Sequence, residues 1–316
     1  MISIRNLNVR YKTPKGLVYA IDNINMDISE GIIFGLVGES GSGKTTLGLT
    51  ILRILPRNAF IESGEIFFSD VNLLNLSEND MMKYRGKKIS MIFQGAMNSL
   101  NPVINIEKQV AEPLIYHENI YLKEALKIAR EKLRLVGLPE NVGKMYPHQL
   151  SGGMKQRVII AMALITEPEL LIADEPTTAL DVITQKNIIL LIKSLQKDYN
   201  ITTLLISHDL PLVSEISDYI GIMYGGKILE IGENNEIIKN YKHPYTAGLI
   251  NSIPSIKNGK RLEGIPGDPI SLLNPSNGCR FYNRCKFANE FCKNYDYTPY
   301  NISNSHKVYC TIYRGV

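Results

Sequence analysis

Eight residues near the start of the chain, GESGSGKT at Gly38–Thr45, have the types and spacing needed to hold a row of phosphates. The glycines let successive backbone N–H groups turn toward an anion, Lys44 can reach the outer phosphates, and the Thr45 hydroxyl can bind Mg²⁺. An apolar run precedes the loop and a helical pattern follows it, so a helix N-terminus adds to the attraction. The expected binding loop consists of Gly38, Glu39, Ser40, Gly41, Ser42, Gly43, Lys44, Thr45 and Thr46.

A second apolar run, LLIADE at Leu170–Glu175, ends in two carboxylates. Asp174 is placed to hold Mg²⁺, directly or through water, and Glu175 is placed to orient or deprotonate an attacking water. Taken alone, two acids at a strand end are more often solvated surface residues. The phosphate-binding loop upstream favours the catalytic interpretation, and the two segments together predict a P-loop NTPase.

A third segment, LSGGMKQR at Leu150–Arg157, resembles the signature motif of ATP-binding cassette (ABC) transporter ATPases, and the order of the motifs agrees with that family. The resemblance implies an α/β fold of the RecA-like kind, with an antiparallel β subdomain and a helical subdomain at about residues 95–160. It also implies that Ser151, Gly152 and Gly153 contact ATP on the opposite subunit. A helix beginning there would offer N–H donors to an anion.

Four further residues take their expected roles from the same resemblance. Gln94 would sense the γ-phosphate and face a membrane subunit, Tyr11 would stack on adenine, Asp181 would end the D-loop, and His208 would contact the γ-phosphate. Each has an ordinary alternative, because a lone histidine after a strand is usually a satisfied polar residue and Tyr11 could be a plain strand residue. The expected catalytic residues are Lys44, Glu175 and His208, and the expected Mg²⁺ site is Thr45, Gln94 and Asp174.

Four stretches resemble the ATPase subunits of dipeptide, oligopeptide and nickel importers. They are FQGAMNSLNP from Phe93, YPHQLSGGMKQRVIIAMAL from Tyr146, HPYTAGLINSIPS from His243, and the cysteine-rich C-terminus. The resemblance implies that ATP hydrolysis drives uptake of peptides, or of nickel or oligosaccharides by the same mechanism. At Gly95–Ala96 the sequence departs from the usual Asp-Pro of this branch, in the region expected to dock on a membrane subunit.

The same resemblance implies a set of partners and a location. The SGGM form of the signature is typical of one of two unlike ATPases, so we expect a heterodimer with a second, homologous ATPase subunit. Two transmembrane permease subunits and an extracytoplasmic solute-binding protein would complete the complex. This chain would lie peripherally on the cytoplasmic face of the cell membrane.

All four cysteines lie after residue 278, at Cys279, Cys285, Cys292 and Cys310. None forms a C-x-x-C pair, so the spacings of zinc ribbons and common ferredoxins do not apply. Four thiolates can still supply a complete shell for a [4Fe–4S] cluster or for tetrahedral Zn²⁺. The family resemblance implies the cluster, in a structural role; zinc, free thiols and disulfides stay open. Nearby basic residues would offset the cluster charge, namely Arg280, Arg284, Lys286 and Lys293.

Composition and patterning divide the chain in two. We expect an ABC ATPase domain at residues 1–240 and a C-terminal extension at residues 241–316, which is rich in Pro, Asn and Tyr and carries the four cysteines. A net charge of +4 without a long basic run predicts no nucleic-acid partner. No apolar stretch has the length of a membrane span, and the N-terminus lacks the apolar core of a signal peptide.

The alternation of apolar and polar residues predicts the elements that position these motifs. Strands are expected at residues 2–10, 18–28, 31–38, 64–68, 88–93, 169–176 and 201–207, with a hairpin at 219–232 that turns at Gly225–Gly226. Helices are expected at residues 44–55, 105–136 and 182–197.

Two other classes of function fit the sequence less well. A soluble ABC ATPase acting on DNA or ribosomes would carry a long coiled coil before the signature, or two cassettes in one chain, and neither is present. An iron–sulfur regulator that merely binds nucleotide would not need both Glu175 and His208.

Overall fold

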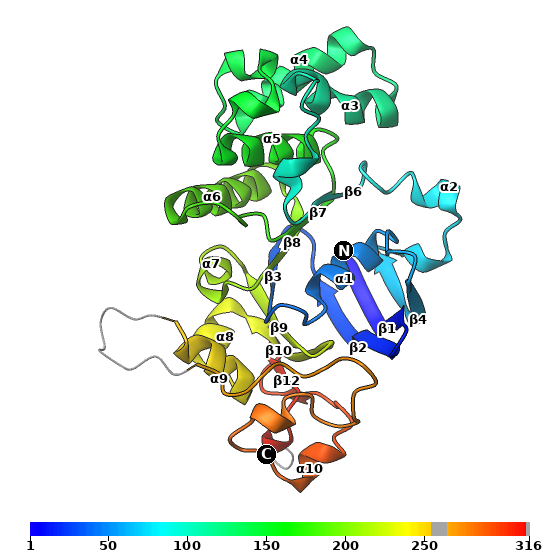
Figure 1. Cartoon of the computed structure of the whole chain (residues 1–316), viewed down its shortest axis with the longest axis vertical. Coiled ribbons are helices and arrows are strands. Elements are labelled where there is room, and N and C mark those ends of the chain that lie inside the picture. Colours follow the sequence, from blue (N-terminus) through cyan, green and yellow to red (C-terminus); the bar gives the residue numbers. More distant parts are fainter. Residues whose placement is uncertain (254–263, 314–316) are drawn as a thin grey trace. The chain divides into compact units, whose positions relative to one another are not determined.

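The computed structural model describes residues 1–253 and 264–313, which form two compact units (Figure 1). The first unit consists of Met1–Ile28, Phe34–Leu74 and Ile206–Val316, and the second of Ser29–Ile33 and Asn75–Leu205. The end of the HPYTAGLINSIPS motif, residues 254–255, lies outside the described residues. Within the described ranges, no helix has the length and apolar character needed to cross a membrane.

The first unit contains a four-stranded antiparallel sheet with strand order β2-β1-β4-β5. Its strands are β1 (Ile2–Thr13), β2 (Gly16–Ile28), β4 (Ala59–Phe68) and β5 (Val71–Asn72). Alternate residues of β1 are buried, as the sequence pattern predicts. The expected antiparallel subdomain is therefore confirmed, although β4 begins earlier than the strand predicted at residue 64.

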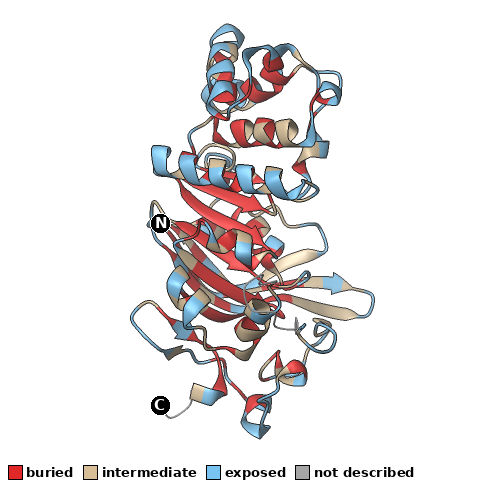
Figure 2. Cartoon of the chain, turned by 90° about the vertical axis from the view of Figure 1, so that its left-hand side faces the viewer, coloured by how far each residue is buried: buried red, intermediate tan, exposed pale blue. Residues whose placement is uncertain are grey.

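A second group of strands in this unit has the order β11-β12-β10-β9-β3. Strand β3 (Ile33–Val37) pairs in parallel with β9 (Tyr219–Tyr224), and β9 forms the predicted hairpin with β10 (Lys227–Glu233). Every residue of β3 is buried, which explains its unbroken apolar sequence (Figure 2). The outermost strands are short, β12 (Lys307–Val308) and β11 (Tyr300–Asn301).

The helices of the first unit are short. Helix α1 (Lys44–Ile51) ends before the predicted residue 55, because Arg53 takes the left-handed conformation at φ 53° and Pro56 follows. The others are α7 (Leu210–Ser214), α8 (Asn234–Lys239), α9 (Pro244–Asn251) and α10 (Glu290–Lys293).

Residues after position 240 are attached to the first unit at buried polar contacts. Glu230 on β10 is fully buried, and its carboxylate accepts hydrogen bonds from the backbone N–H groups of Lys242 (2.6 Å) and His243 (3.0 Å). The same carboxylate lies 2.7 Å from Nε2 of His306. The segment thus adds strands and polar anchors to this unit, while the division at residue 240 stays a prediction from composition.

The second unit contains a strand group of order β8-β7-β6 and most of the longer helices. Strands β6 (Ile89–Ile92) and β7 (Leu170–Asp174) are parallel, and β8 is Thr202–Ser207. The helical stretch predicted at 105–136 is two helices, because Asn119 is left-handed at φ 54°. The helices are α2 (Glu78–Met81), α3 (Ile106–Glu118), α4 (Leu122–Leu135), α5 (Gly152–Leu164) and α6 (Val182–Tyr199).

Helices α3, α4 and α5 contact one another and form the predicted helical subdomain. Helix α6 matches the helix predicted at 182–197, and its buried stripe is Ile188, Ile189, Ile192 and Leu195. Figure 2 shows the opposite face of α6 exposed, as expected for an amphipathic helix.

Candidate functional site

The predicted phosphate-binding loop connects β3 to α1 in the first unit. Lys44 is buried, and its Nζ donates to the carbonyl oxygens of Gly38 (2.7 Å) and Glu39 (2.9 Å) and to Ser42 Oγ (3.3 Å). The ammonium group is therefore held inside the curve of the loop. Because α1 begins at Lys44 without a side-chain cap or an acidic first turn, its N-terminus suits an anion.

Two glycines show why the loop needs this composition. Gly43 has φ +105°, and a Cβ atom there would lie 2.2 Å from the carbonyl oxygen of Ala20. Gly41 has φ +77° with no other atom within 4 Å of a Cβ position, so its backbone faces open space. The first glycine permits close packing, and the second leaves the N–H groups accessible to phosphate.

Tyr11 lies beside this loop, because its hydroxyl is 3.1 Å from Thr46 Oγ1 at the start of α1. His208 directly follows β8 and is exposed. Both residues belong to the first unit together with the phosphate-binding loop.

The carboxylates occupy the end of β7 in the second unit. Asp174 is the last residue of this strand and is 1% exposed. Glu175 follows in the left-handed conformation at φ 45°, which is unusual for a residue other than glycine and is found most often at functional sites. Its carboxylate accepts hydrogen bonds from Gln94 Nε2 and Thr178 Oγ1, both at 3.1 Å. The structure thus brings Gln94 and Glu175 together.

The signature segment caps a helix in the same unit. Ser151 is the N-cap of α5, and its side chain accepts a hydrogen bond from the N–H of Met154 at 3.3 Å. A Cβ atom at Gly153 would lie 2.8 Å from the Thr184 methyl group, so only glycine fits against α6 there. Ser151 and Gly152 are exposed, which leaves this helix end accessible.

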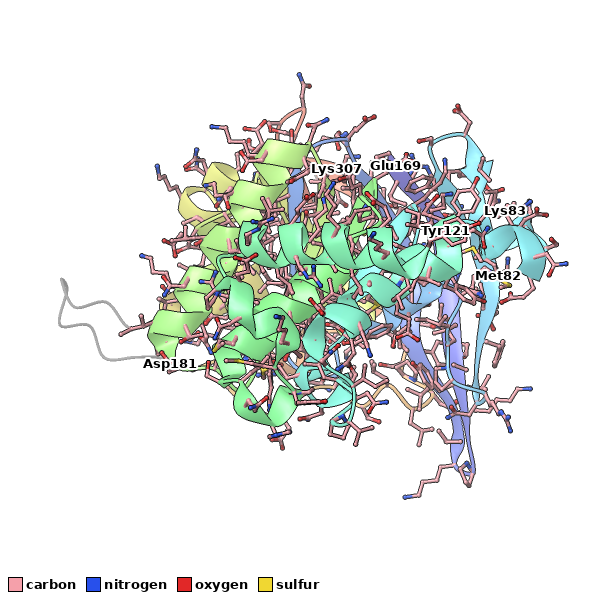
Figure 3. All side chains as sticks on the ribbon, turned by 90° about the horizontal axis from the view of Figure 1, so that it is seen from above. Met82, Lys83, Tyr121, Glu169, Asp181 and Lys307 are labelled. Carbon is pink, nitrogen blue, oxygen red and sulfur yellow. The ribbon has the colours of Figure 1, made fainter. Side chains whose placement is uncertain are left out.

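Asp181 caps α6 at the surface (Figure 3). Its carboxylate accepts from the Thr184 hydroxyl (2.6 Å) and backbone N–H (3.0 Å), and these hydrogen bonds lower its pKa. The next two side chains are apolar yet almost fully accessible, with Val182 79% and Ile183 75% exposed. The first residues of α6 therefore present an apolar surface directly after a fixed acidic cap.

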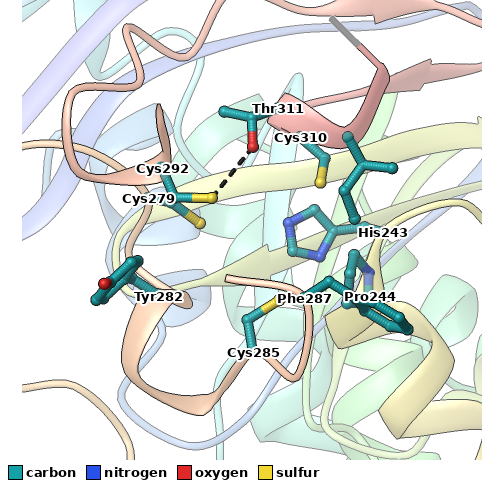
Figure 4. Close-up of a pocket in the computed structure, with 10 residues that line it drawn as sticks. His243, Pro244, Cys279, Tyr282, Cys285, Phe287, Cys292, Cys310 and Thr311 are labelled. Atoms are coloured by element: carbon teal, nitrogen blue, oxygen red, sulfur yellow. Dashed lines mark hydrogen bonds between the residues drawn. The ribbon is translucent and has the colours of Figure 1, made fainter. Parts of the chain in front are cut away.

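All four cysteines line one pocket in the first unit, although they come from separate short elements (Figure 4). The cavity is small, with room for about one water molecule. Its lining, called the thiol pocket below, is His243, Pro244, Cys279, Tyr282, Cys285, Phe287, Cys292, Cys310, Thr311 and Ile312.

Burial dominates the electrostatics of this pocket. It raises the pKa of Cys279 to about 12 and that of Cys310 to about 11, so these two free thiols stay protonated and unreactive. It lowers the pKa of His243 to about 4. His243 Nδ1 accepts the N–H of Tyr245 at 3.0 Å, so the ring proton lies on Nε2, which is buried without a hydrogen-bond partner.

The predicted metal site at the cysteines is not confirmed. Across residues 1–253 and 264–313, no group of three or more His, Cys, Asp or Glu side chains could hold a metal ion, and each cysteine is a free thiol. Three of the four basic residues expected to offset a cluster charge pair with carboxylates: Arg280 with Asp22 (2.6 Å), Lys293 with Glu290 (2.8 Å) and Arg284 with Glu39 (2.7 Å).

The fold and the two groups of motif residues define a P-loop nucleotide-binding protein. Comparison with known proteins then identifies the family. The "ABC transporter" family model matches residues 21–178, and the "Oligopeptide/dipeptide transporter, C-terminal region" model matches residues 229–292. The solved dimer of the ATP-binding cassette MJ0796 with ADP and Pi has a TM-score of 0.67 and 31% identity, over 74% of this chain and 99% of that one.

Two relatives match nearly the whole length. The "Dipeptide transport ATP-binding protein DppD" of Bacillus subtilis (strain 168) is 42% identical over 98% of this chain and 94% of that protein. The "Oligopeptide transport ATP-binding protein OppD" of Escherichia coli (strain K12) is 41% identical over 92% of this chain and 87% of that protein. The chain belongs to the ABC transporter family, in the group of dipeptide and oligopeptide transport ATP-binding proteins.

Sequence reasoning missed several residues of the site. Thr178 supports Glu175, Glu230 anchors the HPY segment, and Tyr245 and Arg284 contact the phosphate-binding loop. The last two come from motifs that were recognised, but only the folded chain shows which way their side chains face.

Proposed function

We propose that this protein is the ATP-hydrolysing subunit of an ABC importer for dipeptides or oligopeptides. The observation that carries the proposal is the likeness to peptide-transport ATP-binding proteins over nearly the full chain, with the phosphate-binding loop, Asp174, Glu175 and His208 all in place. Family members that serve nickel or oligosaccharides would use the same chemistry, and the relatives described above favour peptides.

Each residue then has a role in hydrolysis. Lys44 and the loop N–H groups bind the β- and γ-phosphates, and the Thr45 hydroxyl with Asp174 holds Mg²⁺. Glu175 takes the proton of the attacking water. Gln94 senses the γ-phosphate, and its hydrogen bond to Glu175 supports a link between the two residues. His208 would stabilise charge on the γ-phosphate, and Tyr11 would stack on adenine.

The complete site requires a second ATPase subunit. The exposed cap at Ser151, the N-terminus of α5, and the apolar side chains of Val182 and Ile183 support a partner on this surface. The solved bacterial ABC transporter cassette MJ0796 is dimeric. We propose a heterodimer with a homologous subunit, two permease subunits and a solute-binding protein, at the cytoplasmic face of the membrane.

The four thiols line one pocket and could supply the complete shell of a [4Fe–4S] cluster, which is the occupant that the family resemblance implies. The buried Nε2–H of His243 belongs to the pocket lining, and it suits an anionic, sulfur-rich occupant (Figure 4). Bound there, a cluster would staple a segment with little core of its own.

The transport proposal is tested by peptide uptake in cells that lack this chain. Uptake of a labelled dipeptide should return with the natural protein and stay absent with Glu175→Gln. Normal uptake without the chain would contradict the proposal.

The cluster proposal is tested separately, by iron and sulfide content after purification without oxygen. About four irons per chain are expected, with loss in Cys310→Ser. One zinc per chain, or no metal, would contradict it.

A further inference from the structure

Glu39, the second residue of the phosphate-binding loop, is held by the C-terminal segment from two sides. Its carboxylate binds Arg284 through two parallel contacts, Oε2 to Nη1 at 2.7 Å and Oε1 to Nη2 at 3.1 Å. Its backbone N–H donates to the hydroxyl of Tyr245 at 3.0 Å. Its carbonyl oxygen accepts from Lys44 Nζ at 2.9 Å. Glu39 therefore connects the phosphate-binding lysine to two residues that lie more than 200 positions later in the chain.

The arginine is built into its position. Its side chain is only 6% exposed, against 24% for Glu39. Nε donates to the carbonyl oxygen of Pro266 at 2.8 Å, and the guanidinium carbon lies 5.6 Å from the centre of the Tyr224 ring. A planar guanidinium with these fixed partners presents its fork to a carboxylate in one orientation only. This geometry distinguishes the pair from the exposed ion pairs of the chain.

Both contacts begin next to the thiol pocket. Arg284 ends a short 3₁₀ turn, Tyr282–Arg284, and the next residue, Cys285, lines the pocket. Tyr245 directly follows His243 and Pro244, which also line it. Two of the chain segments that form the pocket wall are thus the ones that reach Glu39.

We propose that Arg284 and Tyr245 are positioning residues of the nucleotide-binding loop, and that through them the affinity for ATP depends on the integrity of the thiol pocket. The proposal rests on the ATPase function proposed above. Neither residue touches the reacting atoms. They fix the Glu39 backbone, and through its carbonyl oxygen they fix where Lys44 points before the phosphates arrive.

The first test measures the dissociation constant of a non-hydrolysable ATP analogue with Mg²⁺ on the full chain. Arg284→Gln should weaken binding by about tenfold, which corresponds to about 1.4 kcal/mol. Tyr245→Phe should weaken it by a smaller factor, and Arg284→Lys should recover only part of the loss because an ammonium lacks the fork. In steady-state hydrolysis, KM for ATP should rise while kcat at saturation changes little.

Arg280→Gln is the matched control. Like Arg284, Arg280 is a buried arginine next to a pocket cysteine, and it binds the carboxylate of Asp22. Unlike Arg284, it has no hydrogen bond or ion pair with Glu39 within the described part of the chain. It should lower thermal stability and leave the ATP-analogue affinity unchanged. An equal loss of affinity in both arginine variants would show a general structural effect and overturn the proposal.

The second test asks whether a change in the thiol pocket affects ATP binding through Arg284. Cys310→Ser changes the pocket from a distant part of the chain and should weaken binding of the analogue in the natural background. In the Arg284→Gln background it should add little, because the connection is already broken. Equal effects in both backgrounds would overturn the link, and Cys285→Ser replaces Cys310→Ser if the latter fails to fold.

The controls also tell this proposal apart from the proposed ATPase function. If Lys44→Ala weakens analogue binding by tenfold or more and Arg284→Gln leaves it intact, only the present inference fails. If the natural protein does not bind the analogue, or if Lys44→Ala binds it equally well, the ATPase assignment fails as well.

Discussion

Glu175 combines a strained backbone conformation with a side chain that is held by hydrogen bonds. The residue sits at the end of a buried strand in a strained backbone conformation, and its side chain is held by Gln94 and Thr178. A strained backbone conformation persists where the surrounding structure holds it. Here that conformation places the Glu175 carboxylate beyond the end of the strand. This is what a base that must meet a water molecule needs.

Replacement of Glu175 tests that role. Glu175→Gln keeps the shape and both hydrogen-bonding neighbours but cannot accept a proton, so hydrolysis should fall by about a hundredfold or more. Binding of ATP should persist. Phosphate release and ATP binding are measured on the same preparation, with the exposed acid Glu169→Gln as control. Turnover at the natural rate in Glu175→Gln would refute the assignment.

Lys44 carries the phosphate-binding role at the same scale. Lys44→Ala removes a charged donor whose hydrogen bonds are worth about 1.5–3 kcal/mol, which corresponds to a tenfold to hundredfold loss of ATP affinity. Equilibrium titration with ATP provides the measurement, and the exposed Lys83→Ala serves as control. An unchanged dissociation constant in Lys44→Ala would eliminate the loop as the phosphate site.

Strand β2 is stabilised by a buried charge cluster. Asp22 binds Arg280 (2.6 Å), Lys227 (2.9 Å) and Arg10 (3.3 Å), and it thereby joins three elements of the first unit. Burial tends to raise the pKa of Asp22, but Lys227 and Arg280 outweigh burial and hold the pKa below its ordinary value of 3.8. The charged form is therefore the one that the fold prefers.

Asp22→Asn should destabilise the protein by about 3–5 kcal/mol, because three cations lose their shared anion. The control on the same strand, Asp27→Asn, breaks an exposed pair with Arg5 and should cost about 1 kcal/mol or less. Because the folded pKa of Asp22 is lowered, its stabilisation is present above pH 3.8 and is lost as pH falls through the folded pKa. Urea unfolding of both variants against pH measures this, and parallel curves for Asp22→Asn and the natural protein would contradict it.

Much of the fold follows from local pattern, and the remainder depends on contacts between distant residues. The glycine-rich loop, the buried strand before it and the hairpin at Gly225–Gly226 are all as predicted, since turn chemistry and burial act locally. Of the left-handed residues that end α1 and α3 early, Arg53 carries no turn signal, whereas Asn119 is of a type that adopts this conformation readily. The pairing of Arg284 with Glu39 spans 245 positions and has no periodic signature at all.

At the scale of the whole molecule, the residues proposed to bind and hydrolyse ATP are distributed over both compact units. The phosphate-binding loop lies in one unit, and Glu175 and the signature segment lie in the other. The exposed apolar side chains of Val182 and Ile183 suit the second ATPase subunit proposed above.

ATP should therefore drive association. Glu175→Gln, mixed with the homologous second ATPase and ATP, should shift to the mass of a pair in light scattering, because bound ATP is not consumed. The combined variant Lys44→Ala and Glu175→Gln should remain unpaired under the same conditions. The same mass with and without ATP would rule out a nucleotide-bridged dimer.

The contact of Arg284 with Glu39 also sets an order of events during synthesis. Ribosomes add about 5–20 residues per second, so the 245 positions between the two residues take roughly 12–50 seconds to translate. For that interval the nascent chain holds a finished P-loop sequence without the two side chains that brace it. A chain terminated before residue 245 would therefore carry the complete loop with neither of the two side chains that hold Glu39.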